Sequence, residues 1–273
     1  MSTSRAFARA RAEDRAVLLG YLPAGFPDVD GGIEAMRAMV EAGCDAIEVG
    51  LPYSDPVMDG PTIQAAAQQA LELGFRTSDV LRTVEAVAAT GVPTVVMTYW
   101  NPVERYGVER FATDLANAGG AGLITPDLTP DYAPEWIAAA DERDLDKIFL
   151  VAPSSTEERL ALTTAASRGF VYATAVMGVT GARAASSDLA GPLVARTRAS
   201  LAEGRDLPVG VGVGVSTGDQ AAEVASYADA VIVGSAFVRT LLDHAGDRAA
   251  GLRALSALTA ELAEGVRRAP ARA

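Results

Sequence analysis

The sequence contains one cysteine, one histidine and one lysine, and each scarcity excludes a class of chemistry. The lone Cys44 has no second thiol for an intrachain disulfide, so we interpret it as a small core residue. A Schiff-base aldolase or a pyridoxal phosphate enzyme needs a lysine amine at its site, whereas Lys147 begins a predicted strand. His244 has no Cys or His partner that could complete a zinc site. We therefore expect no metal and no cofactor, with proton transfer resting on carboxylates, hydroxyls and backbone donors.

Long apolar runs and a basic surface are also missing. No stretch approaches the ~20 apolar residues that span a bilayer, and the start Met-Ser-Thr-Ser-Arg lacks the apolar region of a secretory signal. We therefore expect no membrane association and a cytoplasmic location. The formal charge of −12 argues against nucleic acid as a partner, because phosphates demand a basic surface. A phosphorylated small molecule stays compatible, since backbone N–H groups bind phosphate locally.

Short β-branched runs alternate with longer helical patterns, which is typical of repeated βα units and a parallel sheet. The predicted strands are Val17–Leu22, Ala46–Gly50, Thr94–Thr98, Gly122–Thr125, Lys147–Val151, Phe170–Thr174, Val209–Val213 and Ala230–Val233. The predicted helices are Gly31–Glu41, Ile63–Leu73, Ser78–Ala89, Val108–Ala118, Pro134–Arg143, Glu157–Ser167, Leu189–Leu201, Gly218–Ser226 and Arg248–Arg267, with a leading helix around Arg5–Arg15. Eight strands, each followed by a helix, predict a (β/α)8 TIM barrel that occupies residues 1–273 as a single domain.

Glu48 interrupts the apolar second strand, where an ionised carboxylate is costly to bury without a partner. Asp59 lies on the loop just downstream, among the prolines and glycine that follow the strand. Two carboxylates in different environments can divide acid and base roles between them. The alternative is structural: Glu48 makes a buried ion pair and Asp59 caps an Asp-Gly turn. Residue types alone leave both interpretations open.

Three tyrosines, Tyr21, Tyr99 and Tyr172, lie near the C-terminal ends of predicted strands. In a TIM barrel, the active site lies at that end of the strands. Aromatic residues commonly cover a barrel mouth, so packing is the alternative. What favours a functional role is that they share one rim with Glu48 and Asp59.

Glycine-rich segments follow the last two predicted strands. Val209-Gly-Val-Gly-Val-Gly-Val215 permits close backbone approach to a ligand, and Val233-Gly-Ser235 leads into a short helix starting at Ser235. These two loops form the recurrent phosphate site of the fold, although alternating Gly and Val could also relieve crowding inside the barrel. The loop 175–188 carries Gly178 and Gly181 around Thr180 and could close as a lid or remain an ordinary surface loop.

The stretch Glu48-Val-Gly-Leu-Pro-Tyr-Ser-Asp-Pro-Val-Met-Asp-Gly-Pro-Thr-Ile-Gln64 resembles the signature of the tryptophan synthase α subunit family. Further matches follow in the order of the family along nearly the whole chain. They are Tyr21-Leu-Pro-Ala-Gly-Phe-Pro27, Met97-Thr-Tyr-Trp-Asn-Pro102, Thr125-Pro-Asp-Leu-Thr-Pro130, Gly178-Val-Thr-Gly181, Gly212-Val-Gly-Val-Ser216 and Gly234-Ser235.

This resemblance implies a retro-aldol cleavage of indole-3-glycerol phosphate to indole and D-glyceraldehyde 3-phosphate. Glu48 matches the family's general acid/base, and Asp59 matches the carboxylate that accepts the indole N–H. The substrate-binding positions it implies are Tyr21, Tyr99, Ile124, Leu150, Tyr172 and Thr180. The phosphate-binding positions it implies are Gly181, Gly214, Gly234 and Ser235.

The resemblance also implies an α2β2 complex in which the β subunit carries pyridoxal phosphate and receives indole through a tunnel. The loops around Pro52–Pro56 and Asn101–Pro102 would face that partner, the isolated chain would be monomeric and poorly active, and the leading helix would cover the barrel floor. Three positions depart from the family: Phe26 replaces a frequent aspartate, and Val176 and Met177 stand where some relatives carry Arg and Ser. The alternatives are a catalytically impaired barrel kept as an allosteric partner of the β subunit, or another phosphate-binding barrel isomerase or epimerase.

Overall fold

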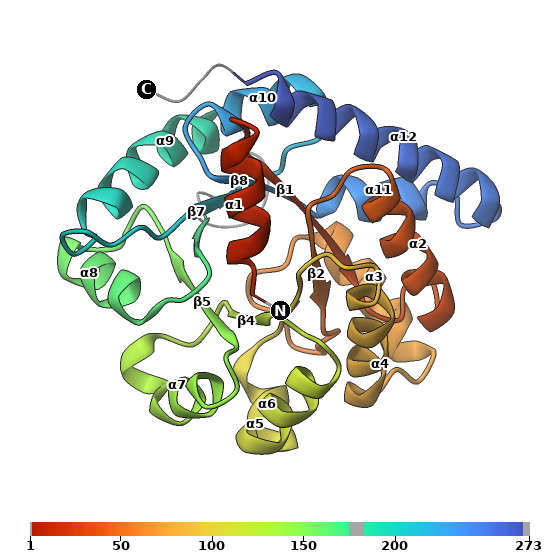
Figure 1. The fold of residues 1–273 in the computed structure, drawn as a ribbon. Coiled ribbons are helices and arrows are strands. Elements are labelled where there is room, and N and C mark those ends of the chain that lie inside the picture. The colour runs from red at the N-terminus through yellow and green to blue at the C-terminus, as the bar shows by residue number, and fades with distance from the viewer. Residues whose placement is uncertain (1, 175–182, 270–273) are drawn as a thin grey trace.

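The computed structural model describes residues 2–174 and 183–269, and within them eight parallel strands form a closed barrel (Figure 1). The strands pair in chain order, and the last one pairs with the first. Their bounds are β1 Val17–Pro23, β2 Ala46–Gly50, β3 Thr94–Met97, β4 Gly122–Thr125, β5 Asp146–Val151, β6 Val171–Thr174, β7 Val209–Gly212 and β8 Ala230–Val233. The predicted (β/α)8 fold is therefore confirmed, and each predicted strand differs from the observed one by at most its end residues.

Helices surround the barrel in the outer ring of Figure 1, except α1, which lies across the barrel in that view. They are α1 Ser4–Ala12, α2 Val29–Glu41, α3 Pro61–Glu72, α4 Thr77–Ala88, α5 Trp100–Tyr106, α6 Val108–Asn117, α7 Pro134–Asp141, α8 Glu157–Ala166, α9 Arg183–Ala199, α10 Gly218–Ala225, α11 Ser235–Leu242 and α12 Arg248–Arg267, with a 3₁₀ turn, η1, at Pro130–Tyr132. The short helix predicted to start at Ser235 is α11.

Two helices differ from the sequence prediction. Helix α5 was not predicted, because Asn-Pro reads as a turn signal; Pro102 lies in its first turn, where the missing N–H is tolerated. Helix α9 begins at Arg183 rather than at Leu189; the glycines at 178 and 181 predict a loop that extends to residue 188, whereas the helix already starts two residues after Gly181. Neither difference moves a strand, so the position of the barrel mouth stays as predicted.

The barrel interior is filled by alternate residues of the strands. Leu19, Ala46, Val95 and Ile232 belong to one buried apolar cluster inside the barrel, whereas Leu18 and Ile47 belong to the layer between strands and helices. Successive side chains of a strand point to opposite faces. The alternation therefore directs every second residue, from the floor to the mouth, into the interior.

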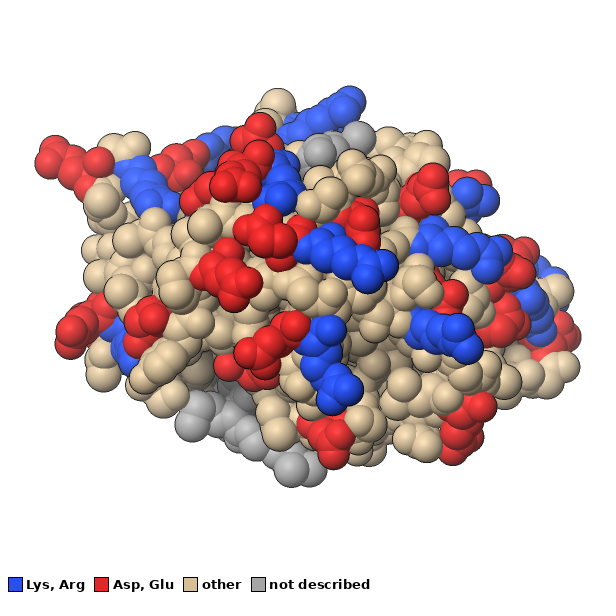
Figure 2. Space-filling model, turned by 90° about the horizontal axis from the view of Figure 1, so that it is seen from below, with Lys and Arg blue, Asp and Glu red and all other residues tan. Residues whose placement is uncertain are grey.

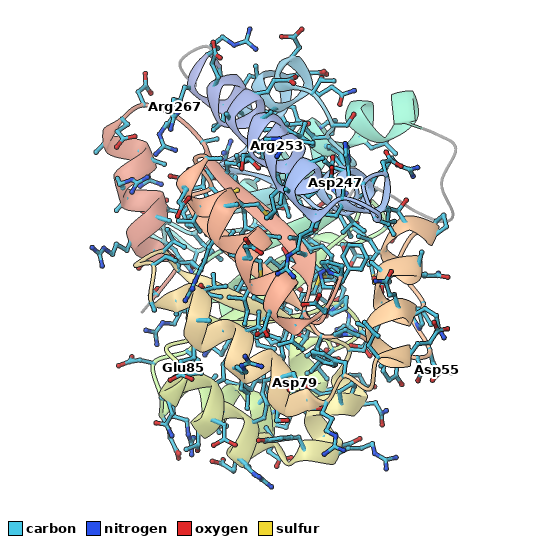
Figure 3. The ribbon with its side chains drawn as sticks, turned by 90° about the vertical axis from the view of Figure 1, so that its right-hand side faces the viewer. Asp55, Asp79, Glu85, Asp247, Arg253 and Arg267 are labelled. Carbon is cyan, nitrogen blue, oxygen red and sulfur yellow. The ribbon has the colours of Figure 1, made fainter. Side chains whose placement is uncertain are left out.

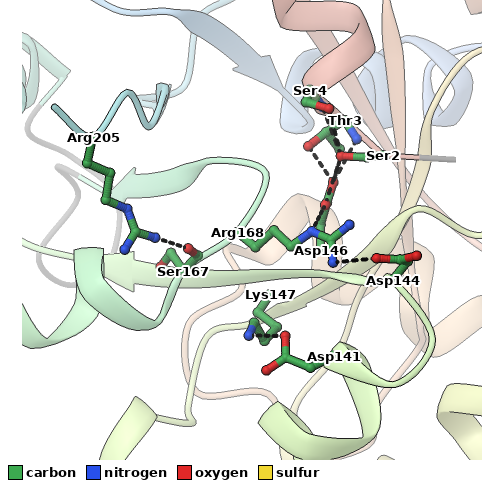
Figure 4. Close-up of polar contacts among 10 residues, drawn as sticks. All are labelled: Ser2, Thr3, Ser4, Asp141, Asp144, Asp146, Lys147, Ser167, Arg168 and Arg205. Atoms are coloured by element: carbon green, nitrogen blue, oxygen red, sulfur yellow. Dashed lines mark hydrogen bonds and ion pairs between the residues drawn. The ribbon is translucent and has the colours of Figure 1, made fainter.

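Helix α1 covers the floor, at the N-terminal ends of the strands. Its Phe7 joins the interior cluster and contacts Phe170, with ring centroids 5.5 Å apart. The chain before it is held by Asp146 at the start of β5, which accepts hydrogen bonds from the N–H and hydroxyl of Thr3 at 2.7 and 2.6 Å (Figure 4). Lys147, near the start of β5, forms an ion pair with Asp141 at this same end, away from the barrel mouth.

A second polar cluster fastens α1 to the start of β2. The Asp45 carboxylate accepts two hydrogen bonds from the Arg15 guanidinium, at 2.7 and 2.9 Å, and a third from Arg9 at 2.7 Å. It also accepts the N–H of Leu18 at 3.0 Å. The side chains of Asp45 and Arg15 are 2% and 4% exposed, so this bidentate ion pair is withdrawn from water.

The outer surface carries charges of both signs. On the side of the molecule in Figure 2, acidic and basic side chains are interspersed rather than gathered into one basic area. Figure 3 shows α2, α4 and α12 along one flank, with α1 at one end of the molecule and Asp55, on the loop after β2, at the other. No helix in residues 2–174 or 183–269 is long and apolar enough to cross a membrane.

Candidate active site

Glu48 points into the barrel near its mouth, because it shares the inward alternation of Ala46 on β2 and pairs in register with Tyr21 of β1. The residue is 1% exposed, and its Oε2 atom has no hydrogen-bond partner in the described parts of the chain. Burial, and then the charge of Asp59, raise the pKa of Glu48 to about 8. No ion pair involves this carboxylate among the side chains of residues 2–174 and 189–269, so none of these residues supplies the partner that the structural alternative needs.

Asp59 lies on the β2–α3 loop and is half-buried. Burial raises its pKa, and a hydrogen bond with the Tyr99 hydroxyl partly offsets that rise. The side-chain amide of Gln64, in the first turns of α3, donates a hydrogen bond to the Asp59 carbonyl at 2.8 Å. Helix α3 begins after Gly60 with no side-chain cap, so Asp59 does not serve as a helix cap. The two carboxylates are thus close enough to interact, in different environments.

The three predicted tyrosines gather around these carboxylates. The Tyr21 ring lies against Gly50, where an added Cβ would be 2.3 Å from its hydroxyl, and the Tyr172 ring lies against Gly212 in the same way at 2.4 Å. Burial raises the pKa values of Tyr21 and Tyr172, and the charges of Asp59 and Glu48 raise them further. Both rings therefore lie at the barrel mouth, and their hydroxyl groups remain neutral.

Apolar side chains complete the wall facing the carboxylates. Ile124 of β4 is buried in the interior cluster, and Leu150 of β5 is partly buried against it. Met97 of β3 is also partly buried against this cluster and pairs in register with Ile124. The sequence did not lead us to predict it. Counting alternate residues onward from Val95 would have found it.

The predicted phosphate end is formed by the loops after β7 and β8. Gly214 has a φ of +75°, a conformation that favours glycine, and Gly234 lies against Tyr21, leaving 3.0 Å for a Cβ. Ser235 is the exposed first residue of α11. The N–H groups of Gly214, Gly234 and Ser235 have no acceptor in the described parts of the chain, so they are available to an anion. Thr180 and Gly181 lie outside the described residues.

The three departures from the family pattern have different outcomes. Phe26 is 1% exposed and packs in the layer between barrel and helices, so it contributes to the core where a carboxylate could not. Val176 and Met177 lie outside the described residues.

These groups give the barrel mouth two chemically different ends. One end holds a carboxyl group that is largely protonated at neutral pH beside a second carboxylate, with an apolar wall suited to a flat ring. The other end presents backbone N–H groups to an anion. Such a site can protonate an aromatic ring and take up a hydroxyl proton in a molecule that also carries a phosphate.

Comparison with known proteins agrees with this geometry. The family model described as tryptophan synthase alpha chain matches residues 7–267. The tryptophan synthase alpha chain of Nocardia farcinica is 64% identical over 263 residues, covering 96% of this chain and 95% of the relative, and that of Salinispora arenicola is 65% identical over 262 residues, covering 96% of both. A solved structure of Mycobacterium tuberculosis tryptophan synthase has 58% identity and a TM-score of 0.89, covering 97% of this chain and 98% of that one.

Proposed function

This chain belongs to the tryptophan synthase alpha chain family, and from that membership we propose that Glu48 and Asp59 are the two carboxylates that carry out its reaction. The chain is a carbon–carbon lyase of tryptophan biosynthesis: it cleaves indole-3-glycerol phosphate to indole and D-glyceraldehyde 3-phosphate. The observation that carries the assignment of roles is the buried carboxyl group of Glu48 at the barrel mouth. Its Oε2 atom has no hydrogen-bond partner in the part of the chain that the structure describes, and its pKa is raised to about 8.

Glu48 acts first as an acid. At neutral pH its carboxyl group is protonated, and it donates that proton to C3 of the indole ring, which leaves the ring as an iminium cation. The resulting carboxylate then takes the proton of the hydroxyl on the carbon attached to C3. The bond between that carbon and C3 breaks, the hydroxyl oxygen becomes the aldehyde oxygen of glyceraldehyde 3-phosphate, and the electron pair returns to the ring. Glu48 ends the cycle protonated, as it began.

Asp59 stabilises the positive charge that the indole ring carries between protonation of C3 and cleavage of the carbon–carbon bond. Its carboxylate accepts a hydrogen bond from the indole N–H, and this bond strengthens as the ring becomes positive. The ring therefore serves as the electron sink, which is consistent with the absence of a lysine at the mouth. Apolar contacts from Ile124, Leu150 and Met97 hold the ring, and the hydroxyls of Tyr21 and Tyr172 border the carboxylates.

The phosphate is held by the backbone N–H group of Gly214, on the loop after β7, and by those of Gly234 and Ser235 at the start of α11, where the helix dipole favours negative charge. Gly181 and Thr180 are proposed to complete the site from the loop after β6. In this arrangement the phosphate fixes the far end of the substrate, which places C3 against Glu48.

A β subunit is the proposed partner, in an α2β2 complex in which that subunit carries pyridoxal phosphate and receives the indole. The loop after β2 supports this, because Val57 is 80% exposed and Met58 is also exposed, an unusual surface for apolar side chains. The neighbouring Asn101 donates a hydrogen bond to the Tyr53 hydroxyl at 3.2 Å, which links the two partner-facing loops. The cytoplasmic location remains a prediction.

The function is tested by giving the purified chain, alone and with its β subunit, indole-3-glycerol phosphate and following indole release. Equal amounts of indole and glyceraldehyde 3-phosphate are expected, with faster release when the β subunit is present. A chain that binds the β subunit and stimulates it, but releases no indole, would instead be an allosteric partner.

Ser235→Asp tests the phosphate end. The added carboxylate lies where the substrate phosphate is proposed to bind, and repulsion between the two should raise KM by about tenfold or more. Inorganic phosphate should inhibit the unchanged chain competitively and the variant more weakly. Ser216→Asp is the matched control, because Ser216 is half-buried on the loop after β7 and its N–H and hydroxyl already donate to Gln220. Equal KM values for the two variants would contradict the placement of the phosphate.

A further inference from the structure

The Asp59 carboxylate is carried by a loop with an exposed tip. Val57 and Met58, the two residues before it, are 80% and 45% exposed, and the Ser54 hydroxyl donates a hydrogen bond to the adjacent Asp55 carboxylate at 2.6 Å. A carboxylate that must meet an indole N–H within hydrogen-bond distance needs a fixed position. Some contact must therefore hold this loop against the barrel.

Tyr99 supplies that contact. It follows β3, is 5% exposed and precedes α5 as its N-cap residue. Its hydroxyl accepts the N–H of Met58 at 2.9 Å, a bond between residues 41 positions apart. The ring also packs against Tyr53 at the other end of the loop, with centroids 5.3 Å apart and planes inclined by 33°. The rigid aromatic ring of Tyr99, after β3, thus holds the loop after β2.

The same hydroxyl also affects the carboxylate. A Tyr99 hydroxyl that accepts the Met58 N–H keeps its own proton for donation, and its proximity lowers the pKa of Asp59, which favours the ionised carboxylate. Gln64 holds the Asp59 carbonyl from the α3 side at 2.8 Å. The residue is therefore held from two directions, by Gln64 at its own carbonyl and by Tyr99 through the N–H of the adjacent Met58.

We propose that Tyr99 is a positioning residue, whose hydroxyl fixes the loop through Met58 and holds the Asp59 carboxylate in the direction of the indole N–H. This inference rests on the proposed roles of Glu48 and Asp59. It differs from a pocket-lining role for Tyr99, which would need only the ring. The ionisable groups around Asp59 are Glu48 on β2, Tyr21 on β1, Tyr172 on β6 and Tyr99 itself.

Tyr99→Phe separates the two roles, because it removes the hydroxyl and keeps the ring. Assayed as the full chain with its β subunit, the variant should lose kcat by about 10–100-fold, as expected for a hydrogen bond to a charged group, with KM changed by less than about threefold. The acid limb of the kcat profile should move to higher pH, because loss of the hydrogen bond raises the pKa of Asp59. A change in KM alone, with the acid limb in place, would contradict the proposal.

Tyr106→Phe is the matched control. Its hydroxyl donates to the Asp114 carboxylate at 2.7 Å on the outside of the barrel, so the same chemical change is made away from the mouth. Its kcat and acid limb should match those of the unchanged chain. In addition, Tyr99→Phe should cost little in an Asp59→Asn background, where no carboxylate is left to position. Additive losses in the double variant would overturn the proposal, whereas full activity of Asp59→Asn would instead overturn the proposed function.

Discussion

Glu48→Gln is expected to lower kcat for indole release by about 10²–10⁴-fold, the usual contribution of general acid–base catalysis. The amide can neither give a proton to C3 nor take one from the hydroxyl. KM should change little, because the carboxyl group acts mainly in the transition state while Ile124, Leu150 and the phosphate end hold the ground state. Steady-state measurement with the β subunit present gives both constants, and unchanged turnover would exclude the assigned role.

The same variant should be more stable than the unchanged chain, which separates lost catalysis from lost folding. The pKa of Glu48 rises from 4.5 to about 8 in the folded state. The stability associated with its neutral carboxyl is fully present below pH 4.5 and is lost as pH rises toward 8, because the unfolded chain ionises first. Removing the group should therefore raise the free energy of unfolding at pH 7 by on the order of 2–3 kcal/mol. Near pH 4 the two proteins should be equally stable.

Of the variants considered, Asp45→Asn is expected to lose the most stability. Asp45 lies at the floor end of β2, opposite the mouth where Glu48 lies. The amide leaves the Arg15 guanidinium buried without its bidentate carboxylate, although Glu13 still accepts a hydrogen bond from it at 2.6 Å. Removing one partner of a buried ion pair should cost about 3 kcal/mol. For a chain of this size, that lowers the thermal midpoint by about 5 °C. Circular dichroism during heating and urea titration measures both quantities.

Asp206→Asn provides the matched comparison, because Asp206 also binds α1 through an ion pair, with Arg11. Both side chains of that pair are more than half exposed, at 67% and 60%, so its loss should cost less than about 1 kcal/mol. Similar losses of unfolding free energy in the two variants would contradict the conclusion that the buried Arg15–Asp45 pair stabilises the barrel floor. Once folded, Asp45→Asn should retain kcat within about twofold, since Asp45 lies at the floor and Glu48 at the mouth.

The fold could be predicted from periodicity because the strands are apolar runs bounded by helical patterns. The second strand, Ala46–Gly50, was predicted without error, and its one polar residue identified Glu48. Helix α5 could not be predicted in the same way, because the Pro102 that usually marks a loop lies in a first turn that tolerates it. Local sequence therefore located the strands better than the short helices between them.

The site was predicted less completely. Strand ends and the family resemblance identified Tyr21, Tyr172 and the glycines of the phosphate end, and the structure brings these groups to one mouth. The contact between the Tyr99 hydroxyl and the Met58 N–H could not be predicted, because it joins two loops from separate βα units. Gln64 was missed for a similar reason: its role depends on the turn that brings its amide back to the Asp59 carbonyl.

The pH dependence of kcat/KM for indole release tests the role of Glu48 most directly. The raised pKa predicts that the reactive form carries a proton on Glu48, so the rate should be high at neutral pH and fall as pH rises through about 8. On the acid side, the rate should fall as Asp59 takes up a proton, at a pH above its ordinary pKa. A rate that stays constant from pH 7 to about pH 9.5 would contradict the proton donor proposed here.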